Sequence, residues 1–279
     1  MKTLGYYNGK IAELDEMTVP MLDRACYFGD GVYDVAITRN YRIFALEEHL
    51  DRFMSSCKLL RITPDKTKEE LAELLSSLLQ KLDSGDQMIY FQYSRGSAPR
   101  SHTYAPDMKP NLWVMIKPFS LKEDPKPLSC MTMEDTRFFH CNIKTINLIP
   151  NVLAAQAAEE QGLDECIFHR GNEVTECAHS NVSILKDGVL LTHPTDNLIL
   201  PGIARAHLIR ACRALGIAVE ERPFSLNELF DADEILVTST TKLFCPVVEL
   251  DGKKVAGKDP KNLTALRAYV WEEYVKETK

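Results

Sequence analysis

The segment RGSAPRSHTY, residues 95–104, gathers Arg95, Arg100 and His102 in a chain whose net charge is −7. In an extended segment, residues i and i+2 point to the same side, so Arg100 and His102 can face one target. Arginine offers a carboxylate a planar pair of donors, and histidine adds another donor. The spacing predicts a carboxylate-binding loop, with a structural role for Arg95. The alternative is a solvated loop whose cations bind nothing.

Lys144 is the second candidate for chemistry. It lies in HCNIKTINLIP, residues 140–150, among apolar side chains. One interpretation is an edge-strand lysine that points to water. The other is a lysine in apolar surroundings, where the loss of hydration favours the neutral amine. A neutral amine can form a Schiff base with an aldehyde cofactor or a keto substrate.

An enzyme that uses pyridoxal phosphate also needs an acid beside the pyridine nitrogen and donors for the phosphate. Glu176, in the strand-like segment NEVTECAHSN, is the candidate acid. Gly202 leads into a helical pattern, so the first amides of that helix can face a phosphate. The candidate phosphate donors are the amides of Ile203 and Ala204, the hydroxyls of residues 238–241, and Arg52.

Seven segments follow one another along nearly the whole chain: DRACYFGDGVYDV, EEHLDR, YFQYSRGSAPRSH, CNIKTINL, NEVTECAHSN, LILPGIAR and VTSTT. In this order they resemble the fold type IV, or class IV, pyridoxal phosphate aminotransferases. The lysine and glutamate segments are typical of the wider family. RGSAPRSH resembles the carboxylate-binding loop of the D-amino acid transaminases. Branched-chain transaminases and aminodeoxychorismate lyases differ at that loop.

The resemblance implies an α+β fold with two domains, a smaller N-terminal α/β domain and a larger C-terminal pseudo-barrel. It implies pyridoxal 5′-phosphate as the cofactor. The implied reaction transfers an amino group between a D-amino acid, such as D-alanine or D-glutamate, and a 2-oxo acid, such as 2-oxoglutarate or pyruvate. The alternatives are an aminodeoxychorismate lyase or a branched-chain amino acid transaminase. A homodimer with active sites at its interface is also implied.

Site residues follow from the same resemblance. Lys144 would be the Schiff-base lysine and proton carrier, and Glu176 would face the pyridine nitrogen. Tyr33, Arg100 and His102 would bind the substrate α-carboxylate, the last two from the partner subunit. The other residues that would hold the cofactor are Arg52, Leu200, Ile203, Ala204 and Thr240.

The chain departs from the family pattern at two places. Glycine and serines usually follow the glutamate, but here the run is Glu176-Cys-Ala-His179, so His179 and Ser180 are possible pocket residues. A histidine there changes the volume and the charge near pH 7, which leaves the exact substrate and reaction type open. GIAR replaces the usual GITR, so Ala204 lacks a hydroxyl, and cofactor binding should weaken by about 1 kcal/mol.

Cys166, His169, Cys177 and His179 have side chains that can bind zinc. Their spacing, C-x2-H-x7-C-x-H, matches no usual zinc module, and residues 170–172 are typical of a hairpin turn between two strands. The pattern therefore favours buried strand cysteines, and no metal is expected.

Composition limits the remaining possibilities. Of the 279 residues, 45% are hydrophobic and 26% charged, which is ordinary for a globular protein. The acidic balance argues against nucleic acid or an anionic membrane as a partner. No apolar run reaches the roughly 20 residues of a membrane span, and the N-terminus lacks the apolar region of an export signal. With eight scattered cysteines, this favours a cytoplasmic protein with reduced thiols.

These candidates must be positioned by two mixed α and β regions. The segment KPFSLKEDPKPLS has three prolines, which predicts a linker. We expect an N-terminal domain at 1–118, a linker at 119–127 and a cofactor-binding domain at 128–279. Hairpins are predicted at 8–9, 187–188 and 251–252, capping boxes at 67–70 and 225–228, and helices at 46–62, 151–162, 202–216 and 260–275.

Overall fold

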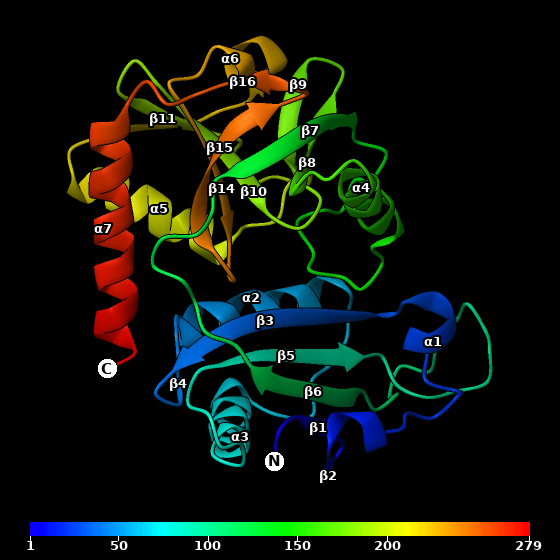
Figure 1. Cartoon of the computed structure of the whole chain (residues 1–279). Helices are drawn as coiled ribbons and strands as arrows, with labels where there is room; N and C mark the ends of the chain where they lie inside the picture. Colours follow the sequence, from blue (N-terminus) through cyan, green and yellow to red (C-terminus); the bar gives the residue numbers. More distant parts are fainter. The chain divides into compact units, whose positions relative to one another are not determined.

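The computed structural model describes residues 1–279 and divides into two compact units (Figure 1). Unit 1 comprises residues 1–121, 143–147 and 274–279, and unit 2 comprises residues 122–142 and 148–273. Lys144 therefore belongs to unit 1, although the residues before and after its short segment belong to unit 2. No helix combines the length and the apolar character that a membrane span requires.

Unit 1 is built on a six-stranded antiparallel sheet in the order β2-β1-β6-β5-β3-β4. Its strands are β1 (Leu4–Tyr7), β2 (Lys10–Ala12), β3 (Gly31–Arg39), β4 (Arg42–Ile43), β5 (Gln87–Ser94) and β6 (Asn111–Pro118). Its helices are η1 (Leu14–Glu16), α1 (Ala25–Phe28), α2 (Leu46–Leu59) and α3 (Lys68–Leu79).

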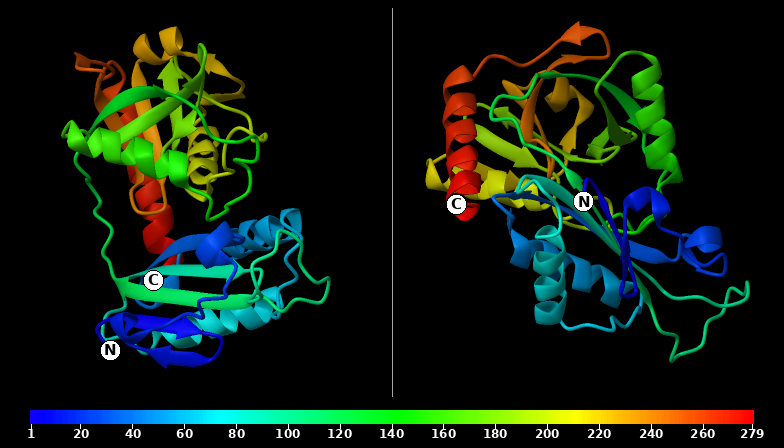
Figure 2. Two further views of the ribbon diagram at one scale, coloured as in Figure 1. Left: turned by 90° about the vertical axis from the view of Figure 1, so that its right-hand side faces the viewer. Right: turned by 60° about the horizontal axis from the view of Figure 1, so that its bottom comes forward.

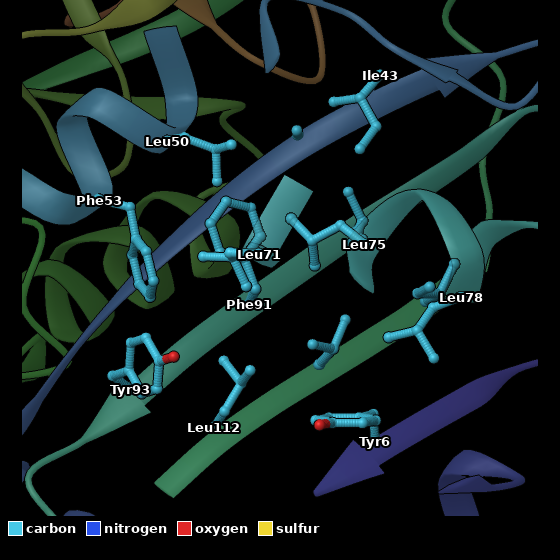
Figure 3. Packing of buried hydrophobic residues seen from close by; sticks show 14 of the residues in the cluster. Tyr6, Ile43, Leu50, Phe53, Leu71, Leu75, Leu78, Phe91, Tyr93 and Leu112 are labelled. Carbon is cyan, nitrogen blue, oxygen red and sulfur yellow. The ribbon is translucent and has the colours of Figure 1, made fainter. Parts of the chain in front are cut away.

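The core of unit 1 lies between one face of this sheet and helices α2 and α3 (Figure 3). Alternate residues of a strand share a face, and Phe91 and Tyr93 of β5 are fully buried on the helix side. Phe53 of α2 packs against both rings, with centroids 4.8 and 5.5 Å away. The apolar period of α3 buries Leu71, Leu75, Leu78 and Leu79 in the same cluster.

Unit 2 contains a curled ten-stranded sheet in the order β12-β11-β10-β14-β15-β7-β8-β9-β13, with β16 paired to β15 (Figure 2). Its strands are β7 (Leu128–Glu134), β8 (Glu165–Arg170), β9 (Glu173–Cys177), β10 (Asn181–Lys186), β11 (Val189–Thr192), β12 (Ala218–Glu221), β13 (Phe224–Ser225), β14 (Glu234–Ser239), β15 (Leu243–Leu250) and β16 (Lys253–Lys254). The remaining helices are α4 (Ile149–Glu160), α5 (Ile203–Ala214), α6 (Leu226–Phe230) and α7 (Pro260–Glu277). The predicted α+β class is confirmed.

The predicted turns and helix ends are confirmed. Asn8-Gly9, Asp187-Gly188 and Asp251-Gly252 each join two antiparallel strands. All six of these residues have positive φ, which asparagine, aspartate and glycine tolerate best. Gly162 and Gly216 follow α4 and α5 with φ of 71° and 74°, as expected for glycines that end helices.

The capping box ahead of α3 yields a stability prediction. Thr67 Oγ1 accepts from Glu70 N at 3.2 Å, and Glu70 Oε2 accepts from Thr67 N at 2.8 Å. Thr67→Ala removes one partner of an otherwise unbonded helix amide, so it should lower the unfolding free energy by about 1 kcal/mol. Urea unfolding measures this, with the neighbouring surface substitution Lys66→Ala as control. Equal midpoints for the two variants would contradict the capping role.

Candidate active site

In unit 1, Lys144 lies against β3. Its carbonyl accepts from Tyr33 N at 2.9 Å, and its amide donates to Ser56 Oγ at 3.2 Å. The Lys144 Nζ atom lies 4.4 Å from the centre of the Tyr33 ring. The segment is irregular and makes one isolated bridge, Val32 with Thr145, so the edge-strand interpretation of Lys144 is wrong. The structure brings the predicted lysine and the predicted substrate tyrosine together.

Arg52 is fixed by a buried aspartate that the sequence analysis missed. Asp34 follows Tyr33 on β3, and its two carboxylate oxygens accept from Arg52 Nε at 2.9 Å and Nη2 at 2.7 Å. His49 Nδ1 lies 2.8 Å from the same carboxylate. Burial disfavours the charged Asp34, but Arg52 and His49 outweigh it and hold the pKa of Asp34 below its ordinary value. The signal in the sequence that could have predicted this contact is a charged residue on the side of β3 that faces α2.

The carboxylate-loop residues lie in the connection between β5 and β6, which extends past the ends of the strands (Figure 2). The guanidinium carbon of Arg100 and the ring of His102 each lie 5.1 Å from the centre of the Phe28 ring. Both side chains therefore lie near one aromatic ring, and their shared task remains a prediction. Arg95 is buried and donates to Asp30, which confirms its structural role.

In unit 2, Glu176 is buried on β9 and is bound by three donors. Arg137 Nη1 donates to one carboxylate oxygen. Asn181 Nδ2 and the Leu200 amide donate to the other, at 2.8 and 3.0 Å. Three donors, one of them a cation, suit an ionised carboxylate. An ionised Glu176 is what a protonated pyridine nitrogen would need.

Arg137 is itself held by hydrogen bonds to a buried aspartate. Asp135 accepts from its Nε and Nη2, each at 2.9 Å, and Arg170 donates to the same aspartate at 3.2 Å. Burial would lower the pKa of Arg137, but Asp135 and Glu176 outweigh burial and raise it. Arg137 therefore stays charged at every working pH and holds Glu176 in place. The sequence analysis missed Asp135 and Arg137, although Asp135-Thr-Arg137 precedes the lysine segment.

The start of α5 offers backbone donors. Gly202 is the N-cap residue of α5, and it has no side chain that could accept hydrogen bonds from the first helix amides. The amides of Ile203 and Ala204 are therefore not bound by an N-cap side chain. A Cβ at Gly202 would lie 1.9 Å from Asn181 Oδ1, so only glycine fits against this asparagine. Asn181 Nδ2 also donates to the Leu200 carbonyl at 3.0 Å. Asn181 thus connects the Glu176 carboxylate to the start of α5.

Thr240 lies in the turn that joins β14 to β15. Two residues earlier, Thr238 pairs with Asn181 across strands β14 and β10, and its hydroxyl donates to the Asn181 carbonyl at 3.4 Å. The structure therefore brings four of the predicted residues of unit 2 to one region around Asn181, namely Glu176, Leu200, Ile203 and Ala204, whereas Thr240 lies two residues beyond Thr238.

His179 and Ser180 both contact Glu165. His179 Nδ1 lies 3.1 Å from Glu165 Oε2, and Ser180 Oγ donates to the same oxygen at 2.6 Å. Burial disfavours the charged Glu165, but these two partners outweigh it and hold the pKa of Glu165 below its ordinary value. The His179 side chain is 58% exposed. Its role as a pocket residue remains a prediction.

The cysteines of the possible zinc pattern are buried strand residues. Cys166 lies on β8 and Cys177 on β9, which flank the predicted turn. Burial raises the pKa of Cys166 to about 12. The structure contains no group of three His, Cys, Asp or Glu side chains placed to hold a metal ion.

Comparison with known proteins identifies the family. The family described as amino-transferase class IV matches residues 31–250. This chain belongs to the class IV aminotransferases, which use pyridoxal phosphate. A buried carboxylate, a helix start without a side-chain cap and a lysine beside a tyrosine are residues that fit this cofactor. The predicted family, fold type and cofactor are confirmed.

Curated relatives cover nearly the whole chain. The D-alanine aminotransferase of Listeria monocytogenes is 40% identical over 273 residues, which span 95% of this chain and 94% of that protein. The D-alanine aminotransferase of Bacillus licheniformis is 36% identical, with coverage of 95% and 93%. Among solved structures, the branched-chain amino acid aminotransferase of Escherichia coli has a TM-score of 0.89 at 22% identity, covering 100% of this chain and 96% of that one. That likeness shows the shared fold.

The contact of Arg137 with Glu176 can be tested by measuring the affinity for the cofactor. Arg137→Lys keeps a positive charge but cannot grip Asp135 and Glu176 at once, because an ammonium lacks the planar fork. The affinity for pyridoxal phosphate should fall about tenfold or more, the worth of one charge-assisted hydrogen bond. Absorbance titration of the cofactor-free protein measures it. Arg213→Lys, on the exposed end of α5, is the matched control. An unchanged affinity in Arg137→Lys would show that the contacts of Arg137 with Asp135 and Glu176 do not contribute to cofactor binding.

Proposed function

We propose that this aminotransferase moves an amino group between a D-amino acid of the D-alanine or D-glutamate type and a 2-oxo acid such as 2-oxoglutarate or pyruvate. The observation that carries the proposal is the placement of the Arg100 and His102 side chains of an exposed loop near the same ring, that of Phe28. An arginine and a histidine that lie close together offer several donors to a carboxylate. The D-alanine aminotransferases that match this chain at 36–40% identity support the same substrate class.

Each named residue has one task in the proposal. Bound pyridoxal phosphate supplies a ring that accepts electrons from the substrate carbon. Lys144 binds the cofactor aldehyde and carries a proton from the substrate α-carbon, and Glu176 holds the proton on the pyridine nitrogen. The phosphate is held by the residues with donors of suitable type: Arg52, Thr240 and the amides of Ile203 and Ala204. Leu200, whose amide binds Glu176, completes the cofactor contacts.

The substrate carboxylate is assigned to Tyr33, Arg100 and His102. Lys144 lies over Tyr33, whereas Arg100 and His102 rest on Phe28. As the resemblance to the family implies, we assign Arg100 and His102 to the site of the partner subunit in a homodimer. Placing the partner's cations opposite Lys144 would fix the α-carboxylate while the amino group faces the lysine.

Branched-chain transamination is the alternative within the family. The solved branched-chain enzymes that match this chain are 22–23% identical to it, and their likeness concerns the fold alone. We keep D-amino acid transamination as the assignment.

The identity of the cofactor lysine is directly testable. Borohydride reduction of the purified enzyme followed by peptide mapping should place the pyridoxyl mass on Lys144, because that lysine contacts Tyr33. Lys117, on the exposed end of β6, and Lys186, on β10 and ion-paired with Asp231, are internal controls. The pyridoxyl group on either of them would overturn the assignment.

The carboxylate role of Arg100 predicts a change in kinetics. Arg100→Ala should lower kcat/KM for D-alanine roughly tenfold to a hundredfold, since a charge-assisted hydrogen bond is worth ~1.5–3 kcal/mol. Arg100→Lys should recover part of the loss, and the cofactor absorbance should stay intact in both variants. An amine without a carboxylate is the control substrate, and its rate should not change. If D-alanine kinetics are normal in Arg100→Ala, the loop does not bind the substrate carboxylate.

A further inference from the structure

The loop that carries Arg100 and His102 has exposed side chains and no regular secondary structure, yet buried groups bind its backbone. Arg24, just before α1, is 3% exposed. Its Nη1 atom donates to the carbonyl of Ser101 at 2.7 Å and to that of Thr103 at 3.5 Å. These two carbonyls flank His102. A buried guanidinium therefore holds the backbone on both sides of His102.

Arg24 is in turn fixed by Asp30. Its Nε atom donates to Asp30 Oδ2 at 2.7 Å, and Arg95 Nε donates to the same oxygen at 2.9 Å. The remaining Arg95 nitrogens donate to the carbonyls of Leu60 and Arg61, at 2.8 and 3.0 Å, where α2 ends. One continuous series of charge-assisted hydrogen bonds thus connects the end of α2 to the loop.

The aromatic ring of Phe28 contacts three cationic or polar side chains of this region. The Arg24 guanidinium carbon lies 4.8 Å from its centre, and that of Arg100 lies 5.1 Å away. The His102 ring lies 5.1 Å away as well. Arg24 and Phe28, one helical turn apart, therefore hold the loop backbone and the two loop side chains.

Gly96 fixes the beginning of the same loop. Its φ is +131°, and a Cβ on it would lie 2.2 Å from the carbonyl oxygen of Lys109. Its own carbonyl accepts from Arg24 N at 2.9 Å, and Ala98 N donates to the Leu22 carbonyl at 3.0 Å. The backbone amide of Arg24 thus holds the start of the loop at Gly96, and its side chain holds the loop beside His102.

We propose that Arg24 is a positioning residue of the substrate-carboxylate site. It does not touch the substrate. It holds residues 98–104 in one conformation, so that Arg100 and His102 need not be ordered when a carboxylate binds. A loop that is ordered in advance loses less entropy on binding, and the benefit is measured as a lower KM. The inference rests on the proposed function for its kinetic consequence, but the order of the loop can be measured separately.

Three variants test this inference. Arg24→Met keeps the length of the side chain and removes every donor, while Arg95 still pairs with Asp30, so no carboxylate is left without a partner. Arg24→Lys keeps one charge and should recover part of the effect. Arg42→Met, which replaces an exposed arginine of β4 in the same unit, is the matched control.

The first measurement is the rate at which trypsin cuts the purified enzyme between Arg100 and Ser101. Cleavage follows the population of open loop, so Arg24→Met should be cut about threefold faster or more, and Arg42→Met should match the parent enzyme. This measurement needs no substrate. Equal cutting rates in all variants would overturn the positioning role of Arg24, whatever the enzyme catalyses.

The second measurement is steady-state kinetics. Arg24→Met should raise KM for D-alanine about tenfold, the worth of one charge-assisted contact, with kcat changed less than about threefold. The rate with an amine that lacks a carboxylate should be unchanged. In the double variant with Arg100→Ala, the Arg24→Met substitution should lower kcat/KM for D-alanine little further, because both substitutions disable the same contact. Independent, additive losses would overturn the inference. A parent enzyme inactive on D-alanine, with fast loop cutting in Arg24→Met, would instead overturn the proposed function alone.

Discussion

The pairing of an aspartate with a guanidinium recurs at each part of the candidate site. Asp34 holds Arg52, Asp30 holds Arg24 and Arg95 together, and Asp135 holds Arg137. All of these groups are buried or nearly so, and a buried ion pair adds little net stability because both charges lose their hydration. What such a pair does provide is geometry, since the planar guanidinium and the planar carboxylate accept few arrangements.

Each pair sets the position of a group to which we assign a part of the cofactor or substrate. The Asp34 pair sets the direction of Arg52 on α2, which we assign to the cofactor phosphate. The Asp135 pair places Arg137 against Glu176. The Asp30 pair extends through Arg24 to the carbonyls beside His102. Charges fixed before the ligand arrives need little rearrangement during the reaction, which is where electrostatic catalysis gains most.

Local features of this fold could be predicted from the sequence because they depend on residues a few positions apart. The Asn8-Gly9 turn and the Thr67 capping box need only their immediate neighbours, and both are present. The contacts that these arginines make beyond their aspartates could not be predicted in this way. Arg137 binds Glu176 across 39 positions, and Arg24 binds Ser101 across 77. Only the folded chain brings such partners together, and a single sequence gives no signal for which distant group each arginine meets.

The Lys144 segment shows the same limit. Its apolar residues suggested a strand, but the chain there makes a single bridge to β3, and α4 is the next element in the sequence. The contact of its amide with Ser56 on α2, 88 positions away, competes with regular pairing. The resemblance to a family, rather than periodicity, is what predicts a catalytic role for Lys144.

The most direct test of the central claim is an absorbance spectrum of the purified enzyme before and after D-alanine or L-alanine is added, with no 2-oxo acid present. The account predicts that D-alanine converts the bound cofactor from its aldehyde form to its amine form, with one equivalent of pyruvate released per site. L-alanine should leave the spectrum unchanged. Conversion by L-alanine and not by D-alanine, or by neither, would contradict the assignment of this chain as a D-amino acid transaminase.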